Sequence, residues 1–234
     1  AVAVAVEACR GRHEGQKCYI CLEAVHPRTG EGLVRGCACG DRDGVSSPEL
    51  GVAHVSCLAE QAKILCFEAE ENNLGREAFV SRFERWGTCG LCEQSYHGVV
   101  ACALGWRCWL TYVMLPRTDV RRYFAMGTLG SALIEGRRGK EALPLLQTSL
   151  TECRFYTPPD SEAYPLMMRH NRQCIARCYN ELGSTPRRSK SNATFSRTSW
   201  SSLDRAAQLP LARQRVWPTR SWPWANMPRQ GISQ

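Results

Sequence analysis

The chain has 234 residues, of which 44% are hydrophobic and 22% are charged. This length allows one or two domains, and the apolar fraction is large enough for a core, so the composition excludes a chain that is disordered throughout. Residues 184–234 contain nine Lys or Arg and one Asp, a net charge of +8 that equals the charge of the whole chain. Residues 1–183 therefore have a net charge of zero, which excludes a strongly basic nucleic-acid-binding domain in this part of the chain.

Fourteen cysteines fit two chemistries, disulfides in a secreted chain or metal ligands in a reducing compartment. The first residues, AVAVAVEACRGRHEG, have no basic start and only a six-residue apolar run, which is too short for the core of a signal peptide. No apolar stretch approaches the length of about 20 residues that a membrane helix needs. We therefore predict a soluble intracellular protein, cytoplasmic or nuclear, with reduced thiols and no membrane contact.

In chain order, residues 1–15 are predicted to be a disordered N-terminus, and residues 16–97 form a zinc-binding module. The module is predicted from four spaced pairs of Cys or His. These pairs are Cys18-x2-Cys21, Cys37-x-Cys39, His54-x2-Cys57 and Cys89-x2-Cys92. Zinc takes four thiolate or imidazole ligands in a tetrahedron, and a C-x2-C turn supplies two of them. Eight ligands in four pairs predict two zinc ions, each in a closed and therefore structural site.

The other cysteines and histidines have no paired spacing of this kind. We expect most of these cysteines to be small buried hydrophobes on helices. The remaining histidines are expected at the surface; they are His13, His26, His97 and His170.

The order of the eight ligands, with His fifth, resembles the RING-CH (RING-variant) zinc fingers over residues 16–97. The resemblance implies a cross-brace, in which alternate pairs share a metal. One zinc ion would take Cys18, Cys21, His54 and Cys57, and the other would take Cys37, Cys39, Cys89 and Cys92. PHD fingers share this ligand order and are the nearest alternative. The C-x-C pair and the long gap of 14 residues before His54 speak against them.

RING-type domains bind a ubiquitin-conjugating enzyme and hold its thioester-linked ubiquitin in a reactive pose. They use an apolar residue in the first C-x2-C, the central helix and an apolar residue near the last pair. The resemblance places these partner-binding roles at Ile20, Trp86 and Leu91. The chain departs from the family at Gly90 and Glu93, where many RING domains have Pro and Arg.

The 31 residues between Cys57 and Cys89 are a longer insert than the family usually shows. Apolar residues recur at helical spacing on both sides of a break formed by Asn72-Asn73 and Gly75. The insert is therefore predicted to be two short helices in a hairpin, with Trp86 packed beside the second zinc.

Residues 98–183 are predicted to be helical. An apolar helix over residues 102–115 ends before Pro116, and AMGTLGSALIEGRRGKEALPLLQTSL resembles a tetratricopeptide repeat. The residues that match its two helices are Leu129, Gly130 and Leu133, then Ala142, Leu146 and Ser149. An ordinary helical hairpin is the alternative.

A second copy of the first-helix pattern follows 46 residues later, at an offset nearer the longer repeats of kinesin light chains. It consists of Ile175, Ala176 and Tyr179. No second helix is predicted after Gly183, where residues 184–234 begin a Ser-rich and basic tail that we expect to be disordered. An arm that contacts nucleic acid or an acidic surface is the alternative role for this tail.

Together these features predict a mostly α fold with a small zinc-stapled α+β module. A RING-like cross-brace finger is followed by a tetratricopeptide-like helical array and the disordered basic tail. The predicted function is that of a ubiquitin-protein ligase, in which the finger recruits the conjugating enzyme and the helices hold a protein substrate. A non-catalytic adaptor is the alternative, and a PHD-like reader of histone tails is the third. We predict no catalytic residues and no cofactor besides zinc.

Deletion of residues 184–234 is predicted to leave the melting temperature of the remaining chain nearly unchanged, because this segment has no apolar period to bury. Differential scanning calorimetry of the full and shortened chains measures the difference. A large drop would instead show that tryptophans of the tail dock on the helices; these are Trp200, Trp217, Trp222 and Trp224.

Overall fold

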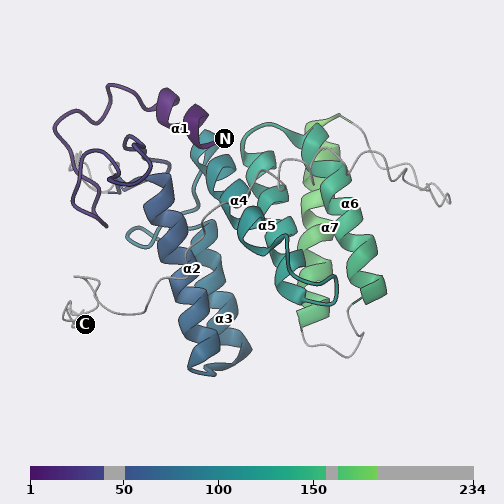
Figure 1. Ribbon diagram of the computed structural model, residues 1–234. Helices are drawn as coiled ribbons and strands as arrows, with labels where there is room; N and C mark the ends of the chain where they lie inside the picture. The colour runs from purple at the N-terminus through teal and green to yellow at the C-terminus, as the bar shows by residue number, and fades with distance from the viewer. Residues whose placement is uncertain (40–50, 157–162, 184–234) are drawn as a thin grey trace, which may run out of the picture. The chain divides into compact units, whose positions relative to one another are not determined.

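The computed structural model describes residues 1–39, 51–156 and 163–183, all within one compact unit, Ala1–Ser191. The described residues are mostly helical (Figure 1). The helices are α1 (Val2–Ala8), α2 (Val55–Glu71), α3 (Gly75–Phe83), the 3-10 helix η1 (Glu84–Trp86), α4 (Gly98–Tyr112), α5 (Val120–Glu135), α6 (Gly139–Tyr156) and α7 (Ala163–Glu181). The predicted tail, residues 184–234, lies outside the described residues. None of the helices described is both long enough and apolar enough to cross a membrane.

The strands expected in the zinc-binding module are not formed within the described residues. Two isolated antiparallel bridges take their place, Val34 with Ala53 and Thr88 with Ser95. In each bridge the chain turns toward a Cys or His pair within three residues, as at Ala53 and His54. A ladder therefore has no room to extend, and the α+β expectation is corrected to a looped segment with single bridges.

The N-terminus also differs from the predicted disorder of residues 1–15. Val2–Ala8 form α1, which packs against α4. Ala5 is fully buried and Cys9, just after the helix, is 7% exposed. The Val and Ala side chains of α1 are apolar and can pack against the apolar surface of α4. This packing stabilises a helix of seven residues that would be too short to be stable alone.

The insert forms the predicted helical hairpin, α2 and α3. The chain reverses at Asn73 and Gly75, which have positive φ angles of 48° and 80°. The ring of Phe83 at the end of α3 lies 5.5 Å from those of Tyr112 and Phe124. These aromatic contacts fix the hairpin to α4 and α5.

The helices α4 to α7 pack in sequence, each against the next, and α7 returns to contact α5 (Figure 1). The hairpin predicted over α5 and α6 is formed, and every residue that carried the tetratricopeptide resemblance there is buried. These residues are Leu129, Gly130, Leu133, Ala142, Leu146 and Ser149.

The second copy of the pattern, on α7, is less well covered. Ile175 and Tyr179 are half-buried and Ala176 is exposed. In the first copy, Gly130 faces Leu146 of α6 and Leu129 faces Gly105 of α4. On α7 the position of a helix equivalent to α6, after Gly183, lies outside the described residues.

Gly105 on α4 marks the closest approach between α4 and α5. A Cβ atom at this position would lie 2.6 Å from the Cβ of Ala132 and 3.2 Å from the Cα of Leu129. Neither atom can move away by side-chain rotation. The contact therefore requires glycine, although glycine costs helix stability.

Gly105→Ala is predicted to lower the free energy of unfolding by about 1–3 kcal/mol, as overpacking of a tight core does. Urea titration of the metal-loaded chain measures this change. Gly87→Ala is the matched control, because its Cβ would come no closer than 3.8 Å to any neighbouring atom. The control is expected to change stability by about 0.5 kcal/mol or less. Equal effects of the two variants would contradict the described packing of α4 on α5.

Candidate metal centres

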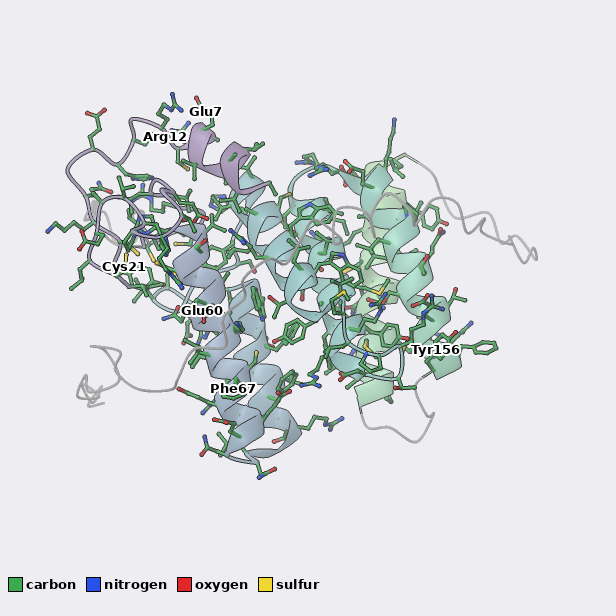
Figure 2. The ribbon with its side chains drawn as sticks, viewed as in Figure 1. Glu7, Arg12, Cys21, Glu60, Phe67 and Tyr156 are labelled. Carbon is green, nitrogen blue, oxygen red and sulfur yellow. The ribbon has the colours of Figure 1, made fainter. Side chains whose placement is uncertain are left out.

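The eight ligand residues predicted from spacing come together in two groups. The first group is Cys18, Cys21, His54 and Cys57, and the second is Cys37, Cys39, Cys89 and Cys92. Within each group, the donor atoms all lie within 4.8 Å of one another. Figure 2 shows the sulfur atoms gathered around the labelled Cys21. Each group could hold a metal ion, and the chain alternates between the two groups, as the resemblance implies.

The two C-x2-C turns have the same local structure. The backbone N–H of Ile20 donates to the sulfur of Cys18, and the N–H of Leu91 donates to the sulfur of Cys89, both at 3.4 Å. Such N–H···S bonds orient the first sulfur of each turn and stabilise negative charge on it.

The residue after each turn adopts a left-handed conformation. The φ angles are 63° at Leu22 and 57° at Glu93. Both side chains carry a Cβ and are strained in this region. Their N–H groups donate back to the carbonyls of Cys18 and Cys89, at 2.9 and 3.0 Å. Each turn is therefore closed on itself, and its two sulfurs are presented on one side.

His54 is fully buried and precedes the first residue of α2. Its Nε2 lies 3.4 Å from the carbonyl of Ala24, so we assign the ring proton to Nε2. The Nδ1 atom then keeps a lone pair that can coordinate a metal ion. It lies 3.4 Å from the sulfur of Cys21 and 3.6 Å from that of Cys57. This arrangement, in which a carbonyl fixes the tautomer of a ligand histidine, is typical of metal sites.

His26 is not the surface residue that its isolated position in the sequence suggests. It is 6% exposed and its ring packs edge-on against that of His54, at 5.3 Å between centroids. Its Nδ1 accepts hydrogen bonds from Thr29, by both the backbone N–H and the hydroxyl. Burial and the neighbouring His54 lower the pKa of His26, so it supports the ligand as a neutral ring.

The second group fits closely around Gly51. A Cβ atom there would lie 2.7 Å from the Cβ of Cys39 and within 2.9 Å of the sulfurs of Cys39 and Cys37. The φ angle of Gly51 is also positive, 76°. No other residue could adopt this backbone beside the sulfurs, so Gly51 shapes the group although it supplies no ligand.

Each group contains one sulfur whose pKa is strongly lowered. Hydrogen bonding from the thiol of Cys57 is the main reason that the pKa of Cys18 falls to about 4. The thiol of Cys37 has the same effect on Cys89, whose pKa also falls to about 4. The donors Cys57 and Cys37 have raised pKa values, because they hold their protons against a neighbouring thiolate. Negative charge thus gathers inside each group, where a divalent cation would stabilise it.

A carboxylate joins the first group to the helices. Glu31 accepts hydrogen bonds from the N–H of Ser56, at 2.9 Å, and from its hydroxyl, at 2.6 Å. Arg107 of α4 pairs with the same carboxylate at 3.2 Å. Glu31 therefore satisfies a backbone N–H at the start of α2, and its negative charge is attracted to the positive end of the helix dipole. Its ion pair with Arg107 also links the loop to α4. Sequence spacing carried no signal for this contact.

The three residues expected to bind a partner have different exposures. Leu91 is 45% exposed, and Ile20 is half-buried. Trp86 is only 1% exposed and packs edge-on against Tyr112 at 6.2 Å between ring centroids. A direct partner contact through Trp86 is therefore corrected to a role in the core, since its large apolar area is already covered by the hairpin and α4.

The seven cysteines outside the two groups are buried, and none of the fourteen cysteines forms a disulfide. Burial raises the pKa of the thiols of Cys66, Cys102, Cys108 and Cys178. These four behave as small hydrophobes, as the sequence predicts.

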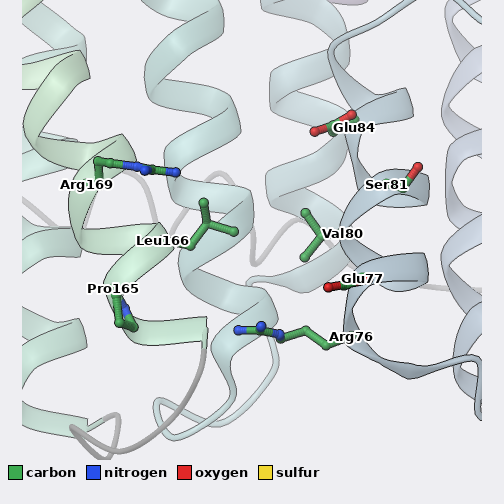
Figure 3. A pocket seen from close by; sticks show the side chains of 8 residues that line it. All are labelled: Arg76, Glu77, Val80, Ser81, Glu84, Pro165, Leu166 and Arg169. Atoms are coloured by element: carbon green, nitrogen blue, oxygen red, sulfur yellow. The ribbon is translucent and has the colours of Figure 1, made fainter.

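A groove of about 600 Å³ lies between α3 and α7 (Figure 3). Val80 and Leu166 point toward each other across it, with Glu77 on one wall and Arg169 on the other. None of its lining residues belongs to the two ligand groups. The groove is therefore a surface of the helices and separate from the candidate metal centres.

No family model, curated protein or solved structure matches the chain.

His54→Ala is predicted to lose one metal ion and part of the helical signal, because the ring belongs to a candidate four-donor group and stands at the start of α2. Elemental analysis and circular dichroism measure both effects. His97→Ala is the matched control, since His97 is exposed and similarly precedes a helix, α4. Unchanged metal content in the His54 variant would remove this residue from the ligand set.

Proposed function

We propose that the chain is a protein-interaction module held by two structural zinc ions, and that it recruits a ubiquitin-conjugating enzyme. The observation that carries the proposal is the alternation of four ligand pairs between two compact groups. Such alternation is the cross-brace pattern of RING-type domains. One donor set has three cysteines and a histidine and the other has four cysteines. Both sets favour zinc over the hard cations, which prefer oxygen ligands.

The metal role proposed here is structural. Four donors close a tetrahedron and leave no position for water or substrate. When bound, zinc supplies folding free energy to loops that have few hydrogen bonds of their own. The protein residues do the remaining work, since they orient the ligands and present side chains to a partner.

The proposed partner surface is formed by the two C-x2-C turns. We call the apolar residues of these turns the knuckle face: the half-buried Ile20 and the exposed Leu22 and Leu91, with Val25 nearby. Leu22 is 64% exposed, Val25 58% and Leu91 45%. Apolar side chains on a backbone this constrained lose little entropy on binding, which favours them as interface anchors. RING-type domains place their grip on the conjugating enzyme at the same turns.

The helices α5, α6 and α7 are proposed to hold a protein substrate in the manner of tetratricopeptide repeats. This proposal rests on the burial of all six residues of the first repeat and on the incompletely covered face of α7. It is independent of the metal ions, because none of these residues belongs to the two ligand groups.

A non-catalytic adaptor is the second candidate, and a specific observation favours it. The buried Trp86 leaves the knuckle face without the central aromatic contact expected of a ligase, and Gly90 and Glu93 replace the usual Pro and Arg. A PHD-like reader is less well supported, because neither Trp86 nor the enclosed hydroxyl of Tyr19 is open to a ligand.

Ile20→Ala and Leu91→Ala are predicted to reduce ubiquitin chain formation tenfold or more, equal to about 1.4 kcal/mol of lost binding. Both variants should retain two zinc ions and the same circular dichroism, since neither side chain is a ligand. An autoubiquitination assay with a panel of conjugating enzymes measures the activity. Met114→Ala is the matched control, because Met114 is 72% exposed and lies in the turn that follows α4.

Three outcomes separate the candidates. Loss of chain formation in both knuckle variants, but not in the control, supports the ligase. Absence of chains from the wild-type protein with every conjugating enzyme refutes the ligase and leaves the adaptor. Loss of zinc from the Ile20 variant would show that Ile20 is a core residue and that the partner surface does not lie on the knuckle face.

A further inference from the structure

A second cluster of reactive side chains lies between α5 and α7, apart from the metal ligands. It contains Cys174 and His170, one turn apart on α7, and Ser131 on α5. The Ser131 hydroxyl lies 3.2 Å from both His170 Nε2 and Cys174 Sγ, and the Cys174 sulfur lies 3.6 Å from His170 Nε2. A thiol, an imidazole and a hydroxyl are thus in mutual contact.

The environment positions the imidazole. The contact with the Cys174 thiol is the main cause that raises the pKa of His170, against the opposing effect of burial. A Cβ at Gly127 would lie 3.1 Å from the His170 ring, so the glycine lets the ring approach α5. A nucleophilic thiol within reach of an imidazole is the pairing that activates cysteine thiols.

Charge around the thiol differs from that around the other cysteines of the helices. Burial raises the pKa of Cys174, but His170, Ser131 and the positive charge of Arg177 outweigh it, and the net pKa is lowered. One turn later on the same helix, burial raises the pKa of Cys178 to about 11. The two thiols lie on the same helix, so the expected difference in their reactivity comes from the side chains around each sulfur.

Access to the site is narrow. Cys174 is only 3% exposed, whereas His170 beside it is exposed. A bulky electrophile cannot reach the sulfur without movement of α7, and the exposed imidazole of His170 marks the side from which a small uncharged molecule would approach. Hydrogen peroxide is a reagent of this size, and it reacts with thiolates rather than with thiols.

We propose that Cys174, His170 and Ser131 form a peroxide-reactive thiol site. The Cys174 thiolate attacks one oxygen of hydrogen peroxide, so that a sulfur–oxygen bond forms as the oxygen–oxygen bond breaks. The leaving hydroxide takes the proton of the His170 imidazolium and becomes water. The products are a sulfenic acid on Cys174, one water molecule and a neutral imidazole; the sulfur is oxidised by two electrons and the peroxide is reduced.

The test treats the full zinc-loaded chain with hydrogen peroxide and traps sulfenic acid with dimedone. Trypsin cleaves after Arg172 and Arg177, so Cys174 and Cys178 are read on different peptides by mass spectrometry. We expect Cys174 to be trapped at least tenfold faster than Cys178. His170→Gln should slow the reaction of Cys174 tenfold or more and move its pH profile to higher pH. Arg169→Gln, which removes an exposed charge from the same helix, is the control.

Equal rates at Cys174 and Cys178 would overturn the proposal, as would an unchanged rate in the His170 variant. Ser131→Ala gives an independent measurement if His170→Gln perturbs folding, and it should slow the reaction without changing the circular dichroism. Oxidation of the zinc ligands is read on separate peptides and is not counted as reaction at this site.

Discussion

The gathering of sulfur and imidazole donors at two points is the constraint on which the first half of the molecule depends. Residues 16–39 contain no helix and form a single bridge, to Ala53. Few backbone hydrogen bonds could order such loops alone, because each ordered residue loses about 1–2 kcal/mol of conformational entropy. A metal ion in each four-donor group would supply the missing order, because each group joins segments that are far apart in sequence. The C-x2-C turns would then be rigid, which accounts for the display of apolar residues such as Leu22 on the surface.

The same constraint orients the helices. His54 stands just before α2 and Cys57 lies in its first turn, so the first group fixes where α2 begins. Glu31 extends this effect, because its carboxylate bonds to both the start of α2 and Arg107 of α4. The second group acts in the same way on the chain between η1 and α4, where Cys89 and Cys92 lie. A loss of metal should therefore affect the junction with the helices as well as the loops.

Sequence spacing predicted the parts of the structure that depend on residue type and short-range order. The eight predicted Cys and His residues gather in two groups that could hold metal, and the α2–α3 and α5–α6 hairpins are formed where their patterns indicate. Contacts between distant segments left no pattern in the sequence: His26 lies against His54, Glu31 accepts hydrogen bonds from Ser56 of α2, and Gly51 fits against two sulfurs. The helix α1 was missed because packing against α4, rather than its own sequence, stabilises seven residues. Trp86 was misplaced because its position near a ligand pair does not reveal which face the hairpin covers.

X-ray absorption at the zinc K edge tests the two-centre account most directly. The fully loaded chain should show tetrahedral zinc with sulfur at about 2.3 Å and nitrogen at about 2.0–2.1 Å. Averaged over two ions, the ligand set of seven Cys and one His predicts seven sulfurs for each nitrogen. A shell containing oxygen, or a sulfur-to-nitrogen ratio near one, would show that the two groups do not hold the metal and would contradict the account.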